Sequence, residues 1–211
     1  MNEYSLKYLI WTFMLEILLI VCLAPTSWIQ KTAKSEAQMI YDYLGTDTLQ
    51  HVHTKSVLWY RDLFQRTGIE RSVREIMLPA PSDRPKKGMD AIGEKVFFPY
   101  IRDRGEAVSD LLHQLLRRLA ILLVWLPFIL IVSIPAFWDG YMSWKIKRTN
   151  FAYTSPFIHK YGSKLSGTLI LIALISLFAP IAIPPMLLPM LAMALVITMG
   201  IFMVSNMPKQ V

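Results

Sequence analysis

The sequence predicts an all-α membrane protein: four transmembrane helices, with a small helical extramembrane domain between the first two. Three observations lead to this fold class. The chain has 211 residues, of which 54% are hydrophobic. Only 18% are charged, against about 25% in a soluble domain. The uncharged residues also gather in runs long enough to cross a bilayer, which takes about 20 residues per helix.

The first span is predicted within residues 1–25, where the apolar run from Tyr8 to Pro25 is interrupted only by Glu16. The start of the chain is weakly basic, and no convincing small-residue cleavage site follows, which argues against a secretory signal peptide. Trp28, just beyond the run, is typical of an interfacial anchor. We therefore expect an uncleaved transmembrane helix.

The predicted extramembrane segment, residues 26–118, carries 15 basic and 12 acidic residues. Apolar residues recur at helical spacing and predict a helix that ends at Gly45 and a second that closes near Gly68. They also predict a third helix from Ile69 to Met77, followed by a Pro-rich loop over 79–88.

A further helix is predicted to lead into the second span. Asp103 and Glu106 stand three residues apart and predict its N-terminal cap. The second span, residues 119–138, contains no charge. Because no helix breaker separates the two, we expect one continuous rod.

Residues 165–204 are predicted to form a transmembrane hairpin, followed by a tail at 205–211. The sequence has 44 consecutive uncharged residues from Leu165 to Pro208, about 66 Å of helix and twice the hydrocarbon thickness. Spans near 165–182 and 187–204 are expected. Four prolines mark the fold-back between or beside them: Pro180, Pro184, Pro185 and Pro189.

The segment between the second and third spans, residues 139–164, is predicted to be a basic cytoplasmic loop. It holds five cations against one acid, Asp139, and short loops this basic stay in the cytoplasm. With four spans, both termini are then cytoplasmic and residues 26–118 are periplasmic.

Glu16 is the one charged residue predicted inside a span, where a carboxylate is costly to bury. One interpretation is a proton or ion relay. The other, which we favour, is a hydrogen bond to a neighbouring helix through a hydroxyl such as Ser133, Thr168 or Ser176. A lone intramembrane carboxylate is a weak transporter signature.

No metal site, cofactor or enzyme is expected. His51 and His53 lack a third strong ligand at a set spacing, and the single Cys22 excludes a cysteine cluster. His113 is expected to pack. Nucleophile elbows, phosphate loops and paired catalytic acids are missing from the sequence.

The basic segment carries a distinctive pattern: Trp138-Asp139-Gly140, Lys145-Ile146-Lys147-Arg148, Thr154-Ser155 and Ile158-His159-Lys160. It resembles the TraJ-like integral membrane protein family of integrating conjugative elements and conjugative plasmids. Asp139-Gly140 and Lys147-Arg148 fit that family's pattern. Thr154 replaces an acidic residue and Ile158 an aromatic one, so the resemblance implies a divergent member.

The resemblance implies a non-enzymatic inner-membrane component of bacterial conjugative DNA transfer that associates with the coupling ATPase of a type IV secretion system. The expected partner-binding residues are Asp139, Lys145, Lys147, Arg148 and His159. The other expected contact is the lipid bilayer. Self-association remains open, and no sequence-specific nucleic-acid binding is expected. The alternatives are a small transporter or channel that uses Glu16, or an assembly or surface-exclusion factor of the same apparatus.

Overall fold

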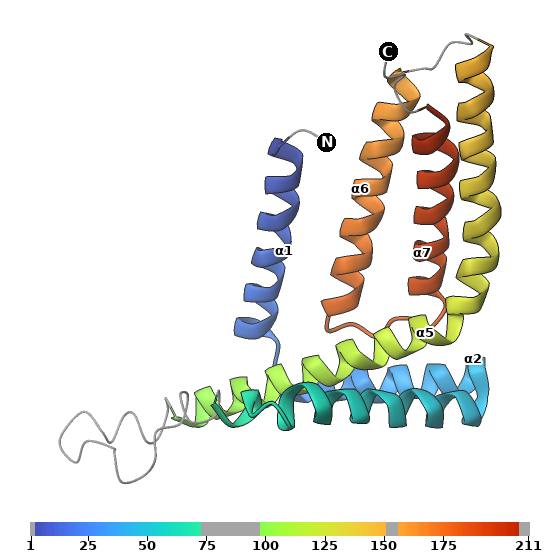
Figure 1. Cartoon of the computed structure of the whole chain (residues 1–211). Helices are drawn as coiled ribbons and strands as arrows, with labels where there is room; N and C mark the ends of the chain where they lie inside the picture. Colours follow the sequence, from blue (N-terminus) through green and yellow to red (C-terminus); the bar gives the residue numbers. More distant parts are fainter. Residues whose placement is uncertain (1–2, 73–97, 151–155, 207–211) are drawn as a thin grey trace. The chain divides into compact units, whose positions relative to one another are not determined.

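The computed structural model describes residues 3–72, 98–150 and 156–206, and every element in these ranges is helical. The long helices are α1 (Glu3–Leu23), α2 (Thr26–Tyr60), α5 (Phe98–Thr149), α6 (Pro156–Phe178) and α7 (Leu187–Ile197), shown in Figure 1. Shorter turns extend two of them: η1 (Arg61–Gln65) follows α2, while η4 (Thr198–Met203) and η5 (Val204–Asn206) follow α7.

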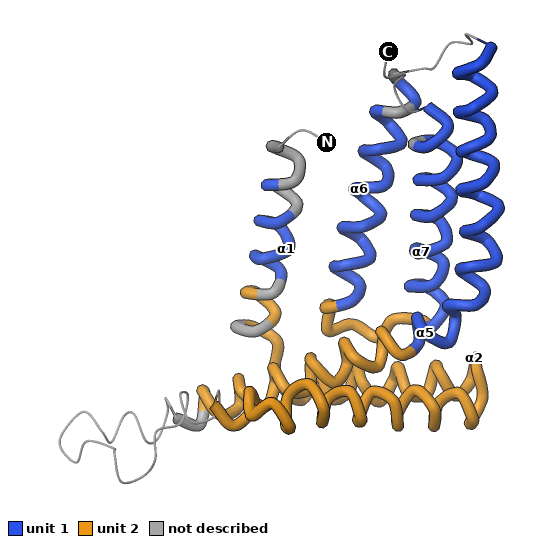
Figure 2. Tube along the Cα trace, in the orientation of Figure 1, with its two compact units in different colours: residues 1–16, 121–177, 185–211 blue, residues 17–120, 178–184 orange. Residues whose placement is uncertain are grey.

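The chain divides into two compact units, coloured separately in Figure 2. Unit 1 contains residues 1–16, 121–177 and 185–211. Unit 2 contains residues 17–120 and 178–184. The short turn between α6 and α7 thus belongs to the same unit as α2.

In unit 2, α2 consists of two helical segments separated at Gly45, where the predicted break is confirmed. Gly45 has φ 82° and ψ 173°, a backbone conformation that essentially only glycine adopts. The second segment starts directly after it and is longer than the predicted second helix. Gly68, with φ 75°, follows η1 and agrees with the predicted close of that helix. The predicted third helix starts at Ile69, but its residues from 73 on and the predicted 79–88 loop lie outside the described residues.

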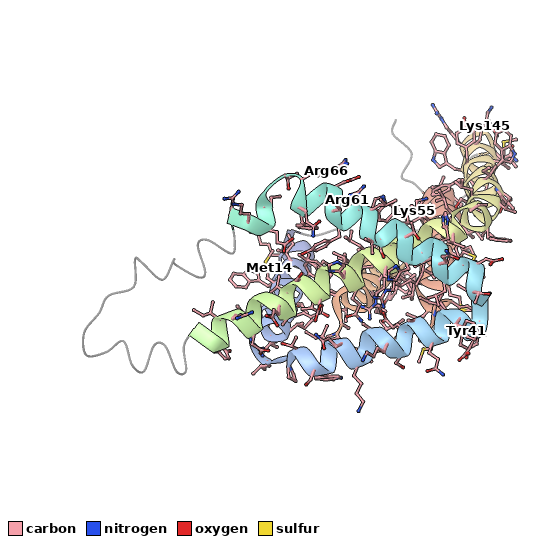
Figure 3. The ribbon with its side chains drawn as sticks, turned by 90° about the horizontal axis from the view of Figure 1, so that it is seen from below. Met14, Tyr41, Lys55, Arg61, Arg66 and Lys145 are labelled. Atoms are coloured by element: carbon pink, nitrogen blue, oxygen red, sulfur yellow. The ribbon has the colours of Figure 1, made fainter. Side chains whose placement is uncertain are left out.

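The N-terminal part of α5 packs against both segments of α2. Gln30 Nε2 of the first segment donates a hydrogen bond to Asp110 Oδ2 (3.0 Å). Tyr60 of the second segment stacks on His113, with 3.7 Å between the ring centroids. Figure 3 shows this part of α5 lying between the two segments. Ala24, Ile29 and Ala107 form a small buried apolar cluster beside it.

Two predicted boundaries of α5 are wrong. The helix begins at Phe98, so Asp103 and Glu106 lie inside it and do not cap it; Pro99 stands in the first turn, where proline is tolerated because that N–H has no helical partner. The helix also continues to Thr149, so the first part of the predicted 139–164 loop is helical. The helix runs without a break across residues 118–119, as the missing helix breaker predicted.

In unit 1, the backbone of the C-terminal part of α5 lies close to the backbone of η4, which follows α7. A Cβ built on Gly140 would lie 2.0 Å from the carbonyl oxygen of Gly200, and one built on Gly200 would lie 2.7 Å from that of Ala136. Only glycines allow such an approach. Two turns further along α5, Lys147 contacts Ser205, so α5 and α7 run parallel.

The hairpin of α6 and α7 agrees with the predicted fold-back. Pro180, Pro184 and Pro185 lie in the connection, and Pro189 lies in the first turn of α7, where it leaves no helical hydrogen bond unmade. Within the described residues, three helices are long and apolar enough to cross a membrane: Tyr100–Thr149, Lys160–Phe178 and Leu187–Asn206. The predicted first span corresponds to α1, where the apolar helix Ile10–Ile20 is shorter than these three.

Candidate functional site

A buried carboxylate, Glu36, is the centre of the polar contacts in unit 2. The first segment of α2 buries one stripe of residues at helical spacing, which includes Ile29, Thr32, Glu36 and Ile40. Glu36 is only 3% exposed. A charge this deeply buried is stable only when it is paired and hydrogen-bonded.

Three residues donate hydrogen bonds to Oε1 of Glu36. Arg118, itself 2% exposed, donates from Nε at 3.0 Å and also from Nη2. Gln114, one turn earlier on α5, donates from Nε2 at 3.2 Å. The backbone N–H of Ile183 donates at 3.3 Å. The carboxylate therefore joins α2, α5 and the α6–α7 connection within unit 2.

Side chains of α5 and α2 also donate hydrogen bonds to backbone carbonyls of the α6–α7 connection. Arg118 Nη2 donates to the Ile181 carbonyl at 2.7 Å, and Thr32 Oγ1 donates to the Pro180 carbonyl at 3.2 Å. Carbonyls that follow a helix lack intrahelical partners. Arg117 completes the group by donating to the Ala33 carbonyl at 2.8 Å. Burial lowers the pKa of Arg117 from its ordinary value, and the nearby Glu36 charge opposes that shift.

A second polar group fixes the start of α2. Arg104 donates to the Ala24 carbonyl at 2.8 Å and to Asp103 Oδ2 at 2.6 Å. Thr26 Oγ1 donates to Asp103 Oδ1 at 2.6 Å. The hydrogen bond from Thr26, followed by that from Arg104, lowers the pKa of Asp103 from its ordinary value. These bonds explain why Asp103, the predicted cap, is held inside a helix.

Sequence reasoning missed the Glu36 cluster, although the sequence carries its signal. Glu36 falls on the same helical stripe as Ile29 and Ile40, and the pair Arg117-Arg118 directly precedes a run of 20 uncharged residues. A charge in register with an apolar stripe predicts a buried ion pair when an opposite charge borders a neighbouring apolar segment.

The predicted partner-binding residues lie in unit 1, at the end of α5 and the start of α6. Asp139, Lys145 and Arg148 are exposed on the last turns of α5; Lys145 is labelled in Figure 3. The Arg148 guanidinium lies 5.6 Å from the centre of the Trp144 ring. His159 belongs to the first turns of α6. Four of the five predicted residues thus lie on the C-terminal part of α5, and His159 follows on the next helix in the sequence.

Lys147 differs from the rest of this set. Its Nζ donates to the Ser205 carbonyl and to Asn206 Oδ1, both at 3.1 Å. A lysine that satisfies carbonyls at a helix C-terminus stabilises that terminus. Lys147 therefore has an intramolecular role, and its binding to a partner stays a prediction. Local sequence patterns do not show this role, because Ser205 and Asn206 lie almost 60 residues away.

Glu16 does not make the expected hydrogen bonds to Ser133 or Thr168. The Ser133 hydroxyl donates to the Ile129 carbonyl at 2.6 Å, and that of Thr168 donates to the Lys164 carbonyl at 3.0 Å. Within the described part of the chain, Glu16 Oε2 is buried without a hydrogen-bond partner.

Three histidines, His51, His53 and His113, have described side chains. His51 and His53 are exposed on α2. In residues 3–72, 98–150 and 156–206, no group of three or more His, Cys, Asp or Glu side chains is placed to hold a metal ion. His113 packs as expected: its ring lies on Tyr60, and its Nδ1 lies 3.0 Å from the Ser109 carbonyl.

Comparison with known proteins adds one match. Residues 24–207 match the model of a family described as "IncC plasmid conjugative DNA transfer protein DtrJ-like". Neither the curated proteins nor the solved structures gave a match. The matched region runs from the start of α2 to the end of η5 and leaves out the whole of α1.

Proposed function

Because the chain belongs to the DtrJ-like family and so takes part in plasmid conjugative DNA transfer, we propose that it acts there as a non-enzymatic inner-membrane component. Its partner in this proposal is a membrane protein of the type IV secretion apparatus, with the coupling ATPase as the first candidate. This role agrees with the finer resemblance to TraJ-like proteins in the basic segment.

The membrane part of the proposal rests on the apolar helices. Three described helices meet the length and composition needed to cross a bilayer. We propose α1 as the fourth span, since its 21 residues are about 31 Å of helix, close to the hydrocarbon thickness. Large apolar side chains on α1, such as Trp11 and Leu18, are exposed and would contact lipid.

The docking part rests on the exposed end of α5, and this is the observation that carries it. Asp139, Lys145 and Arg148 are exposed and form no ion pair with the residues that the structure describes. Arg118 and Lys147, in contrast, bind groups of the chain itself. Exposed cations and a carboxylate on one rigid helix end can make charge-assisted hydrogen bonds with a partner of complementary charge. His159 on α6 adds a polar group close by in the sequence.

Charge reversal at the α5 end tests this proposal. In Lys145→Glu/Arg148→Glu, we expect the chain to insert in the membrane at the normal level, while mating frequency and recovery of the coupling ATPase on affinity purification fall at least tenfold. The matched control is Lys31→Glu/Lys34→Glu, which changes charge equally at two exposed positions of α2. Unchanged mating in the α5 variant, or an equal loss in the α2 variant, would contradict the proposal.

A transporter or channel is the second candidate, favoured by one observation, the buried and unpartnered Oε2 of Glu16. Glu16→Gln separates the two candidates. A relay that carries protons needs the ionisable carboxyl, so its activity is lost in this variant. A docking component that uses the α5 end keeps its mating frequency, because the amide conserves shape and hydrogen bonding. An assembly or surface-exclusion role would appear instead as different proteins in the purified complex.

A further inference from the structure

The first turns of α6 present a continuous stripe of aromatic and cationic side chains. Phe157, Lys160, Tyr161 and Lys164 recur every three or four residues, so they share one face of the helix. All four are exposed, Phe157 by 66% and Tyr161 by 53%. We refer to these four residues as the α6 stripe.

The side chains of the α6 stripe contact one another. The rings of Phe157 and Tyr161 lie 4.3 Å apart between centroids. Lys164 Nζ lies 5.7 Å from the centre of the Tyr161 ring. The stripe thus forms a single surface of stacked rings with a cation against them, and Lys160 is exposed on the same face.

The part of the sequence that contains the α6 stripe has no acidic residue to pair with these cations. From Gly140 to Val211 it contains no Asp or Glu. In unit 1, the exposed acid Asp139 lies on α5, close to the cations of that helix. The charge of the α6 stripe is therefore suited to an anion from outside the chain.

The same face of α6 becomes apolar immediately after Lys164. Leu165 and Ile172 are exposed at 48% and 42%. The hydroxyl of Thr168, which lies between them, donates to the Lys164 carbonyl of its own helix and so needs no water. From Lys164 to Ile172 the helix rises about 12 Å, over which the exposed face changes from cationic to hydrocarbon.

We propose that the α6 stripe binds the headgroup of an anionic phospholipid, with Lys160 and Lys164 on the phosphate and the Phe157 and Tyr161 rings at the interface. A bilayer presents phosphate and hydrocarbon at this spacing, whereas a nucleic acid would leave Leu165 and Ile172 uncovered. Aromatic and basic residues at helix ends are typical of the headgroup region. The inference rests on the membrane insertion included in the proposed function, but not on the docking of the α5 end.

The test compares the lipid retained by the purified full-length chain. Protein is equilibrated with mixed micelles of equal phosphatidylglycerol and phosphatidylcholine, and bound lipid is counted by native mass spectrometry. The wild type is expected to prefer phosphatidylglycerol. Since each surface cation contributes about fivefold to binding of anionic lipid, Lys160→Gln/Lys164→Gln should reduce that preference about 25-fold. Lys160→Arg/Lys164→Arg should keep it.

The matched control removes two cations from the neighbouring helix end. Lys145→Gln/Arg148→Gln is expected to retain the lipid preference, although the proposed function predicts weaker partner recovery for it. An unchanged preference in the α6 glutamine variant overturns the inference. Binding of a labelled 30-nucleotide single strand that is lost in that same variant also overturns it, in favour of nucleic acid. Extraction of the wild type from membranes by alkaline carbonate would instead contradict the proposed function.

Discussion

At the scale of single residues, Glu36 and Arg118 form the most deeply buried ion pair of the described residues. Both side chains also make hydrogen bonds to the α6–α7 connection. Removing one partner of a buried pair leaves an uncompensated charge, which is far more costly than removing both. The pair is therefore testable by comparing single and double substitutions.

We predict that Glu36→Ala destabilises the protein by about 3–5 kcal/mol, because Arg118 stays buried without its carboxylate. The measurement is chemical unfolding in detergent, followed by helical circular dichroism. The double variant Glu36→Met/Arg118→Met should lie much closer to the wild type, since apolar residues of similar volume replace a buried pair at little cost.

The control for this prediction is another carboxylate with an arginine partner. Glu106 accepts from Arg102 at 3.3 Å, but both side chains are exposed, so Glu106→Ala should cost less than about 1 kcal/mol. If Glu36→Ala and Glu106→Ala lowered the free energy of unfolding equally, burial would not increase the contribution of the Glu36 ion pair, and the prediction would be wrong.

Single residues were the hardest level to predict from the sequence. Asp139, Lys145 and Arg148 are exposed, as expected of charged side chains, which are costly to bury without a partner. The internal hydrogen bonds of Lys147 and Glu36 were not predicted, because each side chain contacts residues far away in the sequence. Helical spacing shows which side chains share a face, but not which distant element covers that face.

At the scale of elements, the closest helix contact in unit 1 is made by glycines. Gly140 on α5 and Gly200 in η4 bring two backbones together where no side chain fits. Small residues at such crossings allow apolar helices to gain van der Waals contact that longer side chains would prevent. The crossing also explains why a helix continues through Gly140, where we had predicted a loop to begin.

We predict that Gly140→Ala destabilises unit 1, because the new methyl group would overlap the Gly200 carbonyl, which is backbone and cannot rotate away. Overpacking of this kind costs about 1–3 kcal/mol. The matched control is Gly105→Ala on the same helix, where nothing lies within 4 Å of the added Cβ; alanine is there the better helix former by about 1 kcal/mol. Thermal unfolding in detergent should thus shift in opposite directions, and a common direction would contradict the prediction.

In the described residues, elements were predicted more successfully than residues. The differences lie at helix ends and in the number of helices long and apolar enough to cross a membrane, three where four spans were predicted. The break at Gly45, the continuity of the α5 helix and the fold-back before α7 all follow from local signals of glycine, proline or uninterrupted apolar spacing. The predicted start and end of α5 were wrong, because both places contact residues far away in the sequence. Asp103 accepts a hydrogen bond from Thr26, 77 residues away, and Gly140 and Lys147 contact η4 and η5.

At the scale of the whole molecule, the membership of unit 2 bears on membrane topology. Residues 178–184 are held to α2 and α5 by Glu36, Arg118 and Thr32. In a membrane-inserted chain, the α6–α7 connection must then lie on the same side as the extramembrane segment. The predicted order of spans requires the same result, although it was derived from uncharged runs and prolines without any knowledge of these contacts.

We therefore predict the labelling pattern of single cysteines introduced after Cys22→Ala. Gln50→Cys on α2 and Pro184→Cys in the α6–α7 connection, both exposed positions, should react with a membrane-impermeant maleimide applied from the periplasm. Thr149→Cys at the end of α5 should react only after the inner membrane is permeabilised, because the uncharged 119–138 run separates it from α2 by one crossing. Labelling of positions 50 and 149 from one side would refute the four-span arrangement. Labelling of 184 together with 149, apart from 50, would show that the Glu36 contacts do not hold in the membrane.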